Sequence, residues 1–376
     1  TVSSWTSVER IDAGGGNDVV DASSFAAVVR IQGDEGNDTL IGGAEGDSIF
    51  GNNGADSLVG NGGADVLAGD AGADMMVGGA GDDVFFISEN GDVAIGGAGL
   101  DRARMDPGVS GINLVLTGWS GVERLNGSTG NDTLDASPVS DDMSINGNAG
   151  DDLVIGGSGT NLLFGNTGND TLQGGDGQDF MWGDDGADRY SGGAGDDFFY
   201  IDDQGDVVTD GGAGYDRVTL IRAGSSVSID GTWAGIERVD AAAGAETVDA
   251  TGYSDALFMI GNAGNDSLTG GSGNDSIFGN DGNDVLSGGA GGDDVMLGGA
   301  GADTFIIMDG TGTDRINDWE DGLDIMDVSG IGGVSGFGDL TIVQSGPSTT
   351  ITAGSETIIL TGYLGPLDAS DFDFVG

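Results

Sequence analysis

Apolar residues recur at one place in every nine along much of this chain. From Gly33 to Phe86 the sequence forms six nine-residue rows, whose eighth places are Leu40, Ile49, Leu58, Leu67, Met76 and Phe85. Each of these residues is the middle of a three-residue segment, which predicts a short strand with its central side chain pointing inward. The other six residues are mostly Gly, Asp, Asn and Ala, which predicts a turn. Two rows would close one coil of eighteen residues, so the pattern predicts an all-β fold, a right-handed parallel β-solenoid.

The turns carry a second pattern, which predicts a chemistry. Glycine is frequent at the first, second and fourth places, where we expect backbone angles with φ above zero. Aspartate holds the sixth place, so stacked turns would direct one carboxylate per row and several backbone carbonyls into a shared gap. Calcium suits this gap because it accepts about six to eight oxygen ligands in loose geometry. Zinc prefers nitrogen and sulfur ligands, and the chain has no His and no Cys.

The candidate calcium ligands are the aspartates of the rows and of isolated rows beside them. They are Asp18, Asp38, Asp47, Asp56, Asp65, Asp74, Asp83, Asp101, Asp132, Asp152, Asp170, Asp179, Asp188, Asp197, Asp216, Asp266, Asp275, Asp284, Asp293 and Asp303. The turns expected to supply carbonyl oxygens contain Gly33, Gly36, Gly51, Gly54, Gly60, Gly63, Gly147, Gly150, Gly165, Gly168, Gly174, Gly177, Gly261, Gly264, Gly279 and Gly282. Solvated surface charge is the weaker interpretation, because stacking brings like charges within about 5 Å of each other. With one ion between turns two rows apart, we expect about 12–20 Ca²⁺ ions in the chain.

Composition agrees with a fold that depends on cations. The net charge is −54, from 64 acidic residues against ten basic ones, and such self-repulsion opposes a compact state without counter-ions. Glycine accounts for 79 of 376 residues, but the period of nine and the four prolines exclude collagen. We expect disorder without calcium and order with it.

A longer repeat divides the chain into modules. Trp5, Trp119 and Trp233 are 114 residues apart, and each opens a W-x-x-[VI]-E-R segment. Module 1 spans 1–114 (rows 33–86), module 2 spans 115–228 (rows 147–200), module 3 spans 229–306 (rows 261–306), and a C-terminal β cap spans 307–376. We interpret the tryptophan segments as structural joints, with a ligand pocket as the alternative. No Pro/Ser-rich linker separates the modules, which favours continuous or stacked rolls over separate beads.

Three departures from the repeat predict weaker or distorted sites. Asn161 holds a sixth place and keeps an oxygen but loses a charge. The row at Gly288 contains ten residues, which predicts a bulge, with Asp293 in the sixth place. Ala245-Glu246 stands where the other modules have Asn-Asp before the first array, so we expect a weaker leading site there.

The C-terminal tail differs from the rows and allows a family to be suggested. Leu340–Gln344, Thr349–Thr352 and Thr357–Leu360 are predicted strands that would cover the open edge of the last coil. The nonapeptide rows, lead-ins such as Gly130-Asn131-Asp132, and the tail pattern Asp314-x-Ile316-x-Asp318-Trp319-x-x-Gly322-x-Asp324 together resemble the RTX, or haemolysin-type calcium-binding repeat, family. The resemblance covers nearly the whole chain.

This resemblance implies several further properties. The fold would be a parallel β-roll whose sixth-place aspartates and turn carbonyls bind calcium. Export would use type I secretion machinery that reads an uncleaved C-terminal signal, and Asp371–Val375 resembles the acidic-then-apolar end of such signals. The function stays open, since rolls of this family are attached to proteases, lipases, toxins, adhesins and surface-layer proteins.

The ninth place of alternate rows predicts an interaction stripe. Aromatic residues recur there on one sheet, at Phe50, Phe86, Phe164, Trp182, Tyr200 and Phe278. A contiguous exposed apolar patch usually marks a contact with another molecule. Packing of one part of the chain against another is the alternative that the sequence leaves open.

Enzymatic signals are poor, and we expect no catalytic activity. Without His or Cys the usual hydrolytic triads are absent, and we find no G-x-S-x-G motif. The negative charge disfavours nucleic acid, and no apolar run approaches the roughly 18 residues of a membrane span. The expected partners are calcium and the secretion machinery, with homo-assembly or a cell-surface or polysaccharide partner left open.

Two functions remain. The first is a secreted extracellular structural protein of the cell surface, of surface-layer, adhesin or matrix type, that folds and self-assembles on binding Ca²⁺. The second is the C-terminal calcium-dependent folding and secretion roll of a larger secreted enzyme or toxin. A first residue other than Met, Thr1, keeps this second reading open.

Overall fold

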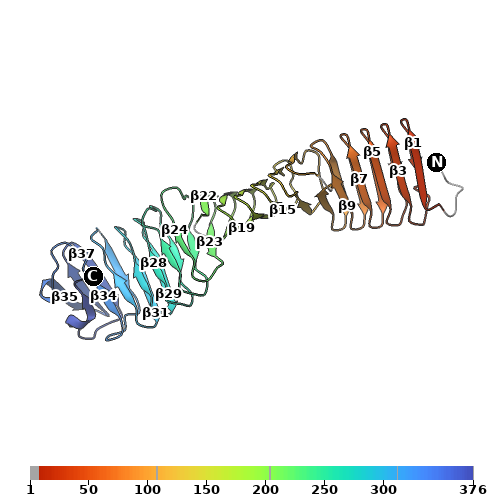
Figure 1. The fold of residues 1–376 in the computed structure, drawn as a ribbon. Coiled ribbons are helices and arrows are strands. Elements are labelled where there is room, and N and C mark those ends of the chain that lie inside the picture. The colour runs from red at the N-terminus through yellow and green to blue at the C-terminus, as the bar shows by residue number, and fades with distance from the viewer. Residues whose placement is uncertain (1–7, 107–108, 203–204, 311, 376) are drawn as a thin grey trace. The chain divides into compact units, whose positions relative to one another are not determined.

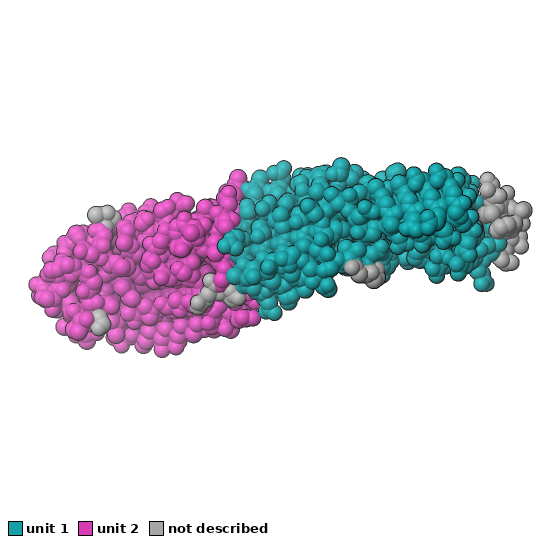
Figure 2. Space-filling model, turned by 45° about the horizontal axis from the view of Figure 1, so that its top comes forward, with its two compact units in different colours: residues 1–195 teal, residues 196–376 magenta. Residues whose placement is uncertain are grey.

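The chain folds into coils of short, mostly parallel strands. A computed structural model describes residues 8–106, 109–202, 205–310 and 312–375. Successive strands of one sheet lie side by side, as β1, β3, β5, β7 and β9 do in Figure 1. The predicted all-β solenoid is therefore confirmed. Packing divides the chain into two compact units, residues 1–195 and 196–376 (teal and magenta in Figure 2), which are described separately below.

In the first unit the odd-numbered and even-numbered strands form different sheets. The odd strands are β1 (Arg10–Gly15), β3 (Arg30–Glu35), β5 (Ser48–Asn53), β7 (Val66–Ala71), β9 (Val84–Ile87), β11 (Arg102–Met105), β13 (Arg124–Asn126), β15 (Met143–Ala149), β17 (Asn161–Thr167) and β19 (Phe180–Asp185). One even sheet contains β2 (Val19–Asp21), β4 (Thr39–Ile41), β6 (Ser57–Gly62), β8 (Met75–Ala80) and β10 (Val93–Ala98). The next contains β12 (Asn113–Val115), β14 (Thr133–Asp135), β16 (Leu153–Ile155), β18 (Thr171–Asp176) and β20 (Arg189–Ala194).

The second unit repeats this arrangement and ends in a cap. Its odd strands are β21 (Phe198–Ile201), β23 (Arg217–Leu220), β25 (Arg238–Asp240), β27 (Phe258–Ile260), β29 (Ser276–Asp281), β31 (Val295–Ala300) and β33 (Thr313–Ile316). Its even strands are β22 (Val207–Ala213), β24 (Ser226–Ser228), β26 (Thr247–Asp249), β28 (Ser267–Thr269), β30 (Val285–Ser287), β32 (Thr304–Ile306) and β34 (Ile325–Asp327). The cap adds β35 (Leu340–Ser345), β36 (Ser348–Ala353), β37 (Glu356–Thr361), β38 (Phe372–Asp373) and two short 3₁₀ helices, Phe337–Asp339 and Ala369–Asp371.

The strand register confirms the coil of two rows. In the even sheet of the first unit Thr39 pairs with Ser57, and Ser57 pairs with Met75, a step of eighteen residues each time. Many strands are longer than the predicted three residues, because the parallel strand pairing continues into the turn: Asn52 of β5 pairs with Asp70 of β7. The stacked turns therefore belong to the hydrogen-bonded ladder and are held in fixed positions.

The core is a column of single inward-facing side chains. Every eighth-place residue of the first array, from Leu40 to Phe85, is 0 % exposed. Each such side chain contributes roughly 1.5–3 kcal/mol through removal from water. Only about one large side chain per row is buried in this way, so the core is thin for a chain of this length.

The joints between the arrays also have a structural role. Between the arrays of the first unit, Arg124 of β13 pairs with Arg102 of β11 on one side and Ser144 of β15 on the other, so the ladder continues across the spacer. Trp119 is buried, and its indole N–H donates a hydrogen bond to the Asp92 carbonyl at 2.9 Å; Trp5 lies outside the described residues.

The three strands expected in the tail are present in the cap. β35, β36 and β37 pair antiparallel, and β37 pairs parallel with β33. The cap therefore covers the edge that the last coil would otherwise expose.

Candidate calcium centres

The sixth-place aspartates form ladders along the edges of the solenoid. The backbone N–H of Asp38 donates to Asp56 Oδ1 at 2.7 Å, and the N–H of Asp56 donates to Asp74 Oδ1 at 2.7 Å. The turns of the intervening rows form a second ladder, in which the Asp47 N–H donates to Asp65 Oδ1 at 2.6 Å. The same contact recurs in the other arrays, for example from Asp152 to Asp170 and from Asp266 to Asp284. Stacking thus aligns the carboxylates along each edge, one per coil.

The second carboxylate oxygen of many ladder residues is buried without a hydrogen-bond donor, whereas Asp47 and Asp275 use Oδ2 to accept the backbone N–H groups of Gly43 and Gly271. In the part of the chain that the structure describes, Oδ2 is buried and has no hydrogen-bond partner in Asp18, Asp38, Asp56, Asp65, Asp74, Asp83, Asp101, Asp152, Asp170, Asp216, Asp266 and Asp284. A buried anionic oxygen without a partner costs several kcal/mol. A repeated set of such oxygens requires a repeated source of positive charge.

Backbone oxygens converge on the same spaces. A Cβ added to Gly51 would lie 2.2 Å from Asp56 Oδ2 and 2.8 Å from the carbonyl oxygen of Gly69. At Gly60 the corresponding distances, to Asp65 Oδ2 and to the Gly78 carbonyl oxygen, are 2.1 and 2.7 Å. Carboxylate and carbonyl oxygens gathered in this way are the ligands that calcium prefers.

The role expected for the first glycine of each row is therefore wrong. Gly33, Gly51 and Gly60 do not have positive φ; the left-handed places are the second and fourth, as in Asn52 (φ 73°) and Gly54 (φ 137°). The first place is glycine because any side chain would occupy the space that the two oxygens face. The fourth place has a close approach as well, since a Cβ on Gly54 would lie 2.0 Å from the Gly36 carbonyl oxygen.

The fourth-place carbonyls of the predicted turns stack in this manner throughout. The fourth-place carbonyls that lie against the fourth-place residue of the next coil are those of Gly36, Gly54, Gly63, Gly150, Gly168, Gly177, Gly264 and Gly282. The first-place carbonyls of Gly51, Gly60, Gly174 and Gly279 instead face the first-place residue of the previous coil. Gly33, Gly147, Gly165 and Gly261 each lie against the Oδ2 atom of their own row's aspartate. The structure thus brings the predicted glycines and aspartates together.

Burial and mutual repulsion change the ionisation of the ladder carboxylates. Burial raises the pKa of Asp74 to about 7, against the backbone N–H of Asp56 that holds it down, and the charges of Asp92, Asp56 and Glu89 raise it further. Burial likewise raises the pKa of Asp65 and of Asp266 to about 7. A raised pKa means that the protein alone stabilises the ionised carboxylate poorly. This is expected of a metal ligand in the absence of its cation.

One predicted ligand is displaced by a single residue. In the ten-residue row at Gly288 the buried ladder position belongs to Asp294, whose Oδ1 accepts the Asp275 N–H at 2.8 Å, and Asp293 is exposed. The turn absorbs the extra residue through left-handed backbone at Gly289, Gly291 and Gly292. Counting back two places from the apolar Met296 would have indicated Asp294, whereas counting forward from Gly288 gave Asp293.

Several ladder members were missed by the sequence analysis. Glu123 Oε2 accepts the Asp101 N–H at 2.6 Å and Glu237 Oε2 accepts the Asp216 N–H at 2.7 Å, so the glutamates of the joints continue the ladders. The signal was their recurrence at the 114-residue spacing. Asp92, Asp314 and Asp324 also accept ladder hydrogen bonds.

The two substituted rows differ from each other. Glu246 is buried, and its N–H donates to Asp266 Oδ1 at 2.8 Å, so a carboxylate remains where Ala245-Glu246 replaces Asn-Asp. Asn161 instead donates its amide to Asp179 Oδ1 and to the Gly159 carbonyl oxygen, both at 2.9 Å. An amide donor thus stands where the other rows have a carboxylate, and the weaker site there stays a prediction.

The predicted aromatic stripe lies on the outer face of the odd strands. Its six members, from Phe50 to Phe278, are half-buried. Phe164 and Trp182 stack with ring centroids 4.9 Å apart and planes 10° apart. Each of these two rings therefore has one face covered by the other.

No group of three or more His, Cys, Asp or Glu side chains gathers into a metal site among the described residues. Each step of a ladder offers few carboxylates, so backbone carbonyls must complete the calcium ligands.

No helix in the described parts of the chain is long and apolar enough to cross a membrane.

Comparison with known proteins agrees with this geometry. The profile of the RTX calcium-binding nonapeptide repeat (4 copies) matches residues 9–26, 30–58, 50–85, 115–137, 144–163, 164–199, 260–293 and 289–305, more than half of the chain. The chain belongs to the RTX calcium-binding repeat family, and it binds multiple calcium ions. No curated protein matches it.

Two solved structures match parts of this chain. The AlgE6R3 subunit of the Azotobacter vinelandii mannuronan C5-epimerase is 28 % identical over 37 % of this chain and 80 % of that one, with a TM-score of 0.23. The extracellular lipase LipA of Serratia marcescens is 20 % identical over 60 % of this chain and 40 % of that one, with a TM-score of 0.21. The match thus spans less than half of the lipase.

Proposed function

We propose that this protein is an extracellular structural component, of surface-layer, adhesin or matrix type, that calcium folds and stiffens after type I secretion. The observation that supports this proposal is the set of buried ladder carboxylates with an oxygen lacking any donor. RTX repeats are typical of secreted proteins, which supports the extracellular location. The sequence contains no His and no Cys, so we propose no catalytic role for the chain.

The mechanism follows from charge. In a calcium-poor cytoplasm the net charge of −54 keeps the chain expanded, in a form that can pass through an export channel. Outside the cell, calcium enters the stacked turns, and its binding free energy becomes folding free energy. Sites of extracellular modules often have Kd values of roughly 10⁻⁴–10⁻³ M, which suits a switch between the two compartments. Nearest-neighbour stacking makes the transition cooperative along each array.

A calcium titration followed by circular dichroism and light scattering tests the proposal. We expect β signal and larger particles to appear together as calcium is added, and both to be lost on chelation. Folding without any assembly would favour the alternative role, a folding and secretion roll for a larger enzyme. A full β signal in chelator would contradict the folding switch itself.

A further inference from the structure

The scarce positive charge of this protein is concentrated on the outer face of the odd strands. Eight of the ten basic residues lie in those strands: Arg10, Arg30, Arg102, Arg104, Arg124, Arg217, Arg238 and Arg315. Arginines pair directly across neighbouring strands, Arg10 with Arg30, Arg102 with Arg124, and Arg217 with Arg238. Like charges directly opposite each other are destabilising in a sheet, so these pairs need an external or internal counter-charge.

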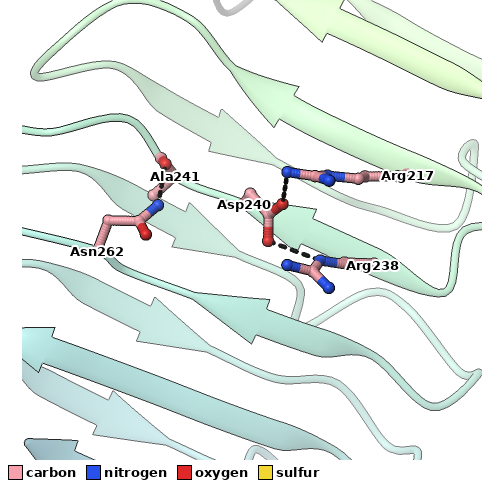
Figure 3. Close-up of polar contacts among 5 residues, drawn as sticks. All are labelled: Arg217, Arg238, Asp240, Ala241 and Asn262. Atoms are coloured by element: carbon pink, nitrogen blue, oxygen red, sulfur yellow. Dashed lines mark hydrogen bonds and ion pairs between the residues drawn. The ribbon is translucent and has the colours of Figure 1, made fainter.

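Two of the three joints supply that charge internally. In the second unit Asp240 is nearly buried between Arg217 and Arg238 and forms an ion pair with each, at 2.8 Å to Arg238 Nε (Figure 3). The neighbouring Asn262 donates to the Ala241 carbonyl oxygen at 2.7 Å and holds the adjacent backbone (Figure 3). At the first joint Arg10 Nε pairs with Asp12 at 2.7 Å.

The middle joint lacks this counter-charge. Asn126 occupies the place that Asp12 and Asp240 hold in the other two joints, 114 residues away on either side. Arg102, Arg104 and Arg124, which we call the middle-joint patch, are exposed, and none of them forms an ion pair in the part of the chain that the structure describes.

The nearby acidic groups form no ion pair with the patch in the described part of the chain. Asp82 and Asp83 line a hollow of about 220 Å³ with Arg102 and Arg124, but Asp82 accepts the Leu100 N–H and Asp83 belongs to a ladder. Asp106 is close enough to Arg104 for their charges to interact, without forming an ion pair. The Arg104 guanidinium lies over the Phe86 ring, 4.2 Å from its centroid, a contact that favours this orientation of the side chain. The three guanidinium groups are therefore exposed and without a bonded counter-ion among the described residues, on a strongly acidic molecule.

We propose that the middle-joint patch docks the acidic turn edge of a second copy of this chain. Calcium occupies the ladder carboxylates, but exposed acidic residues outside the ladders remain on the turns of the first unit, among them Glu35, Asp151 and Asp185. This charge complementarity is present within one sequence, so no other partner is needed. The patch and the turn edge are different surfaces, which makes the contact heterologous, and a heterologous contact that does not close into a ring produces an open assembly.

A polysaccharide is the less suitable occupant. Sugar rings pack on exposed aromatic faces, whereas one face of Phe86 lies under the Arg104 guanidinium, and one face each of Phe164 and Trp182 is covered by the other ring. The inference rests on the proposed function as a self-assembling structural protein, and it adds the surface, the partner and the kind of symmetry.

The sharpest test is the substitution Asn126→Asp, which places at the middle joint the residue that the other two joints already have. Its charge-matched control is Asn113→Asp, at an exposed place on the even strand β12, outside both the odd strands and the acidic turns. Association in calcium is measured by sedimentation velocity at low and high salt, with circular dichroism to verify folding. Two exposed ion pairs are worth about a factor of ten in association, so Asn126→Asp should require about tenfold more protein to assemble. The control and the wild type should assemble alike, and salt should weaken both.

A second pair of variants removes charge instead of adding it. Arg102→Gln with Arg124→Gln should also suppress assembly, while Arg189→Gln with Arg222→Gln, which lie outside the odd strands, should not. Equal assembly of patch and control variants would overturn the inference and leave the proposed function standing. A wild type that stays monomeric in calcium would overturn both the inference and the proposed function. If that monomer bound an acidic polysaccharide in a salt-sensitive way, and Asn126→Asp abolished the binding, the patch would be assigned to a polyanion.

Discussion

The first glycine of a row offers a direct test of the calcium centres. We predict that Gly60→Ala removes one centre, because the added methyl group would lie 2.1 Å from Asp65 Oδ2 and 2.7 Å from the Gly78 carbonyl oxygen. Gly62→Ala in the same row is the matched control, since nothing lies nearer than 3.4 Å to its Cβ. Neither glycine has positive φ, so backbone strain is absent from both variants.

The expected magnitude combines three contributions. At a calcium concentration about one hundred times Kd, one lost site removes about 2.7 kcal/mol of stability. Displacement of Asp65 also weakens its hydrogen bond from the Asp47 N–H, 2.6 Å long, and a hydrogen bond to a charged group is worth about 1.5–3 kcal/mol. Alanine restricts the unfolded chain more than glycine does, which raises the free energy of unfolding by about 0.4–1 kcal/mol in both variants. The net loss for Gly60→Ala is thus about 3–5 kcal/mol, whereas Gly62→Ala should be neutral or slightly stabilised.

Thermal unfolding in saturating calcium, with equilibrium dialysis to count bound ions, measures both effects. For a unit of this size 1 kcal/mol shifts the unfolding temperature by roughly 2–4 °C, so Gly60→Ala should unfold roughly 10 °C lower. It should also bind fewer ions than Gly62→Ala. Equal unfolding temperatures and equal ion counts in the two variants would refute the assignment of these oxygens to calcium.

Two further predictions concern the aspartate ladders, and a third concerns the column of inward apolar side chains. The pKa values of Asp65, Asp74 and Asp266 are raised from 3.8 to about 7 in the folded chain, so proton uptake favours the fold below pH about 7, and this stability is lost as pH rises through that value. Circular dichroism in chelator should therefore show more β structure at pH 5 than at pH 8. In a calcium titration, the midpoint of the folding transition should move to higher calcium concentration on acidification. A β signal that grows with pH in chelator would contradict this prediction. Asn161→Asp should add calcium-binding capacity to the second module and raise its unfolding temperature in calcium, because it replaces the amide that donates to Asp179 Oδ1; unchanged ion binding by dialysis would argue against a centre there. Leu67→Ala should cost about 2–5 kcal/mol, because Leu67 is 0 % exposed in the single inward column, and a loss below 1 kcal/mol in calcium melts would show that the column is not the core.

The extent of what sequence could predict is clearest at individual residues. The periodic apolar residues from Leu40 to Phe85 specified inward strands, and the sixth-place aspartates specified an edge of oxygen ligands, because both patterns depend only on local spacing. Asp293 was a wrong choice for the same reason: in a ten-residue row with two adjacent aspartates, counting forward from Gly288 and counting back from Met296 indicate different residues. The pairing of coils decided for Asp294, since only that carboxylate meets the Asp275 N–H.

Other features depend on contacts between residues far apart in sequence. The role of the first glycine became clear only when the stacked coil placed the carbonyl of the next row beside it, and Glu123 and Glu237 joined the ladders because the joints keep the strand register. The unpaired arginines of the middle joint were equally hidden, because an arginine's lack of a partner is a property of its surroundings. Sequence determined the period, the ion and the fold class of this protein, since each follows from residue type and local spacing. Tertiary structure decided which oxygens converge and which charges stay unmatched, because stacking brings together groups separated by one or more coils.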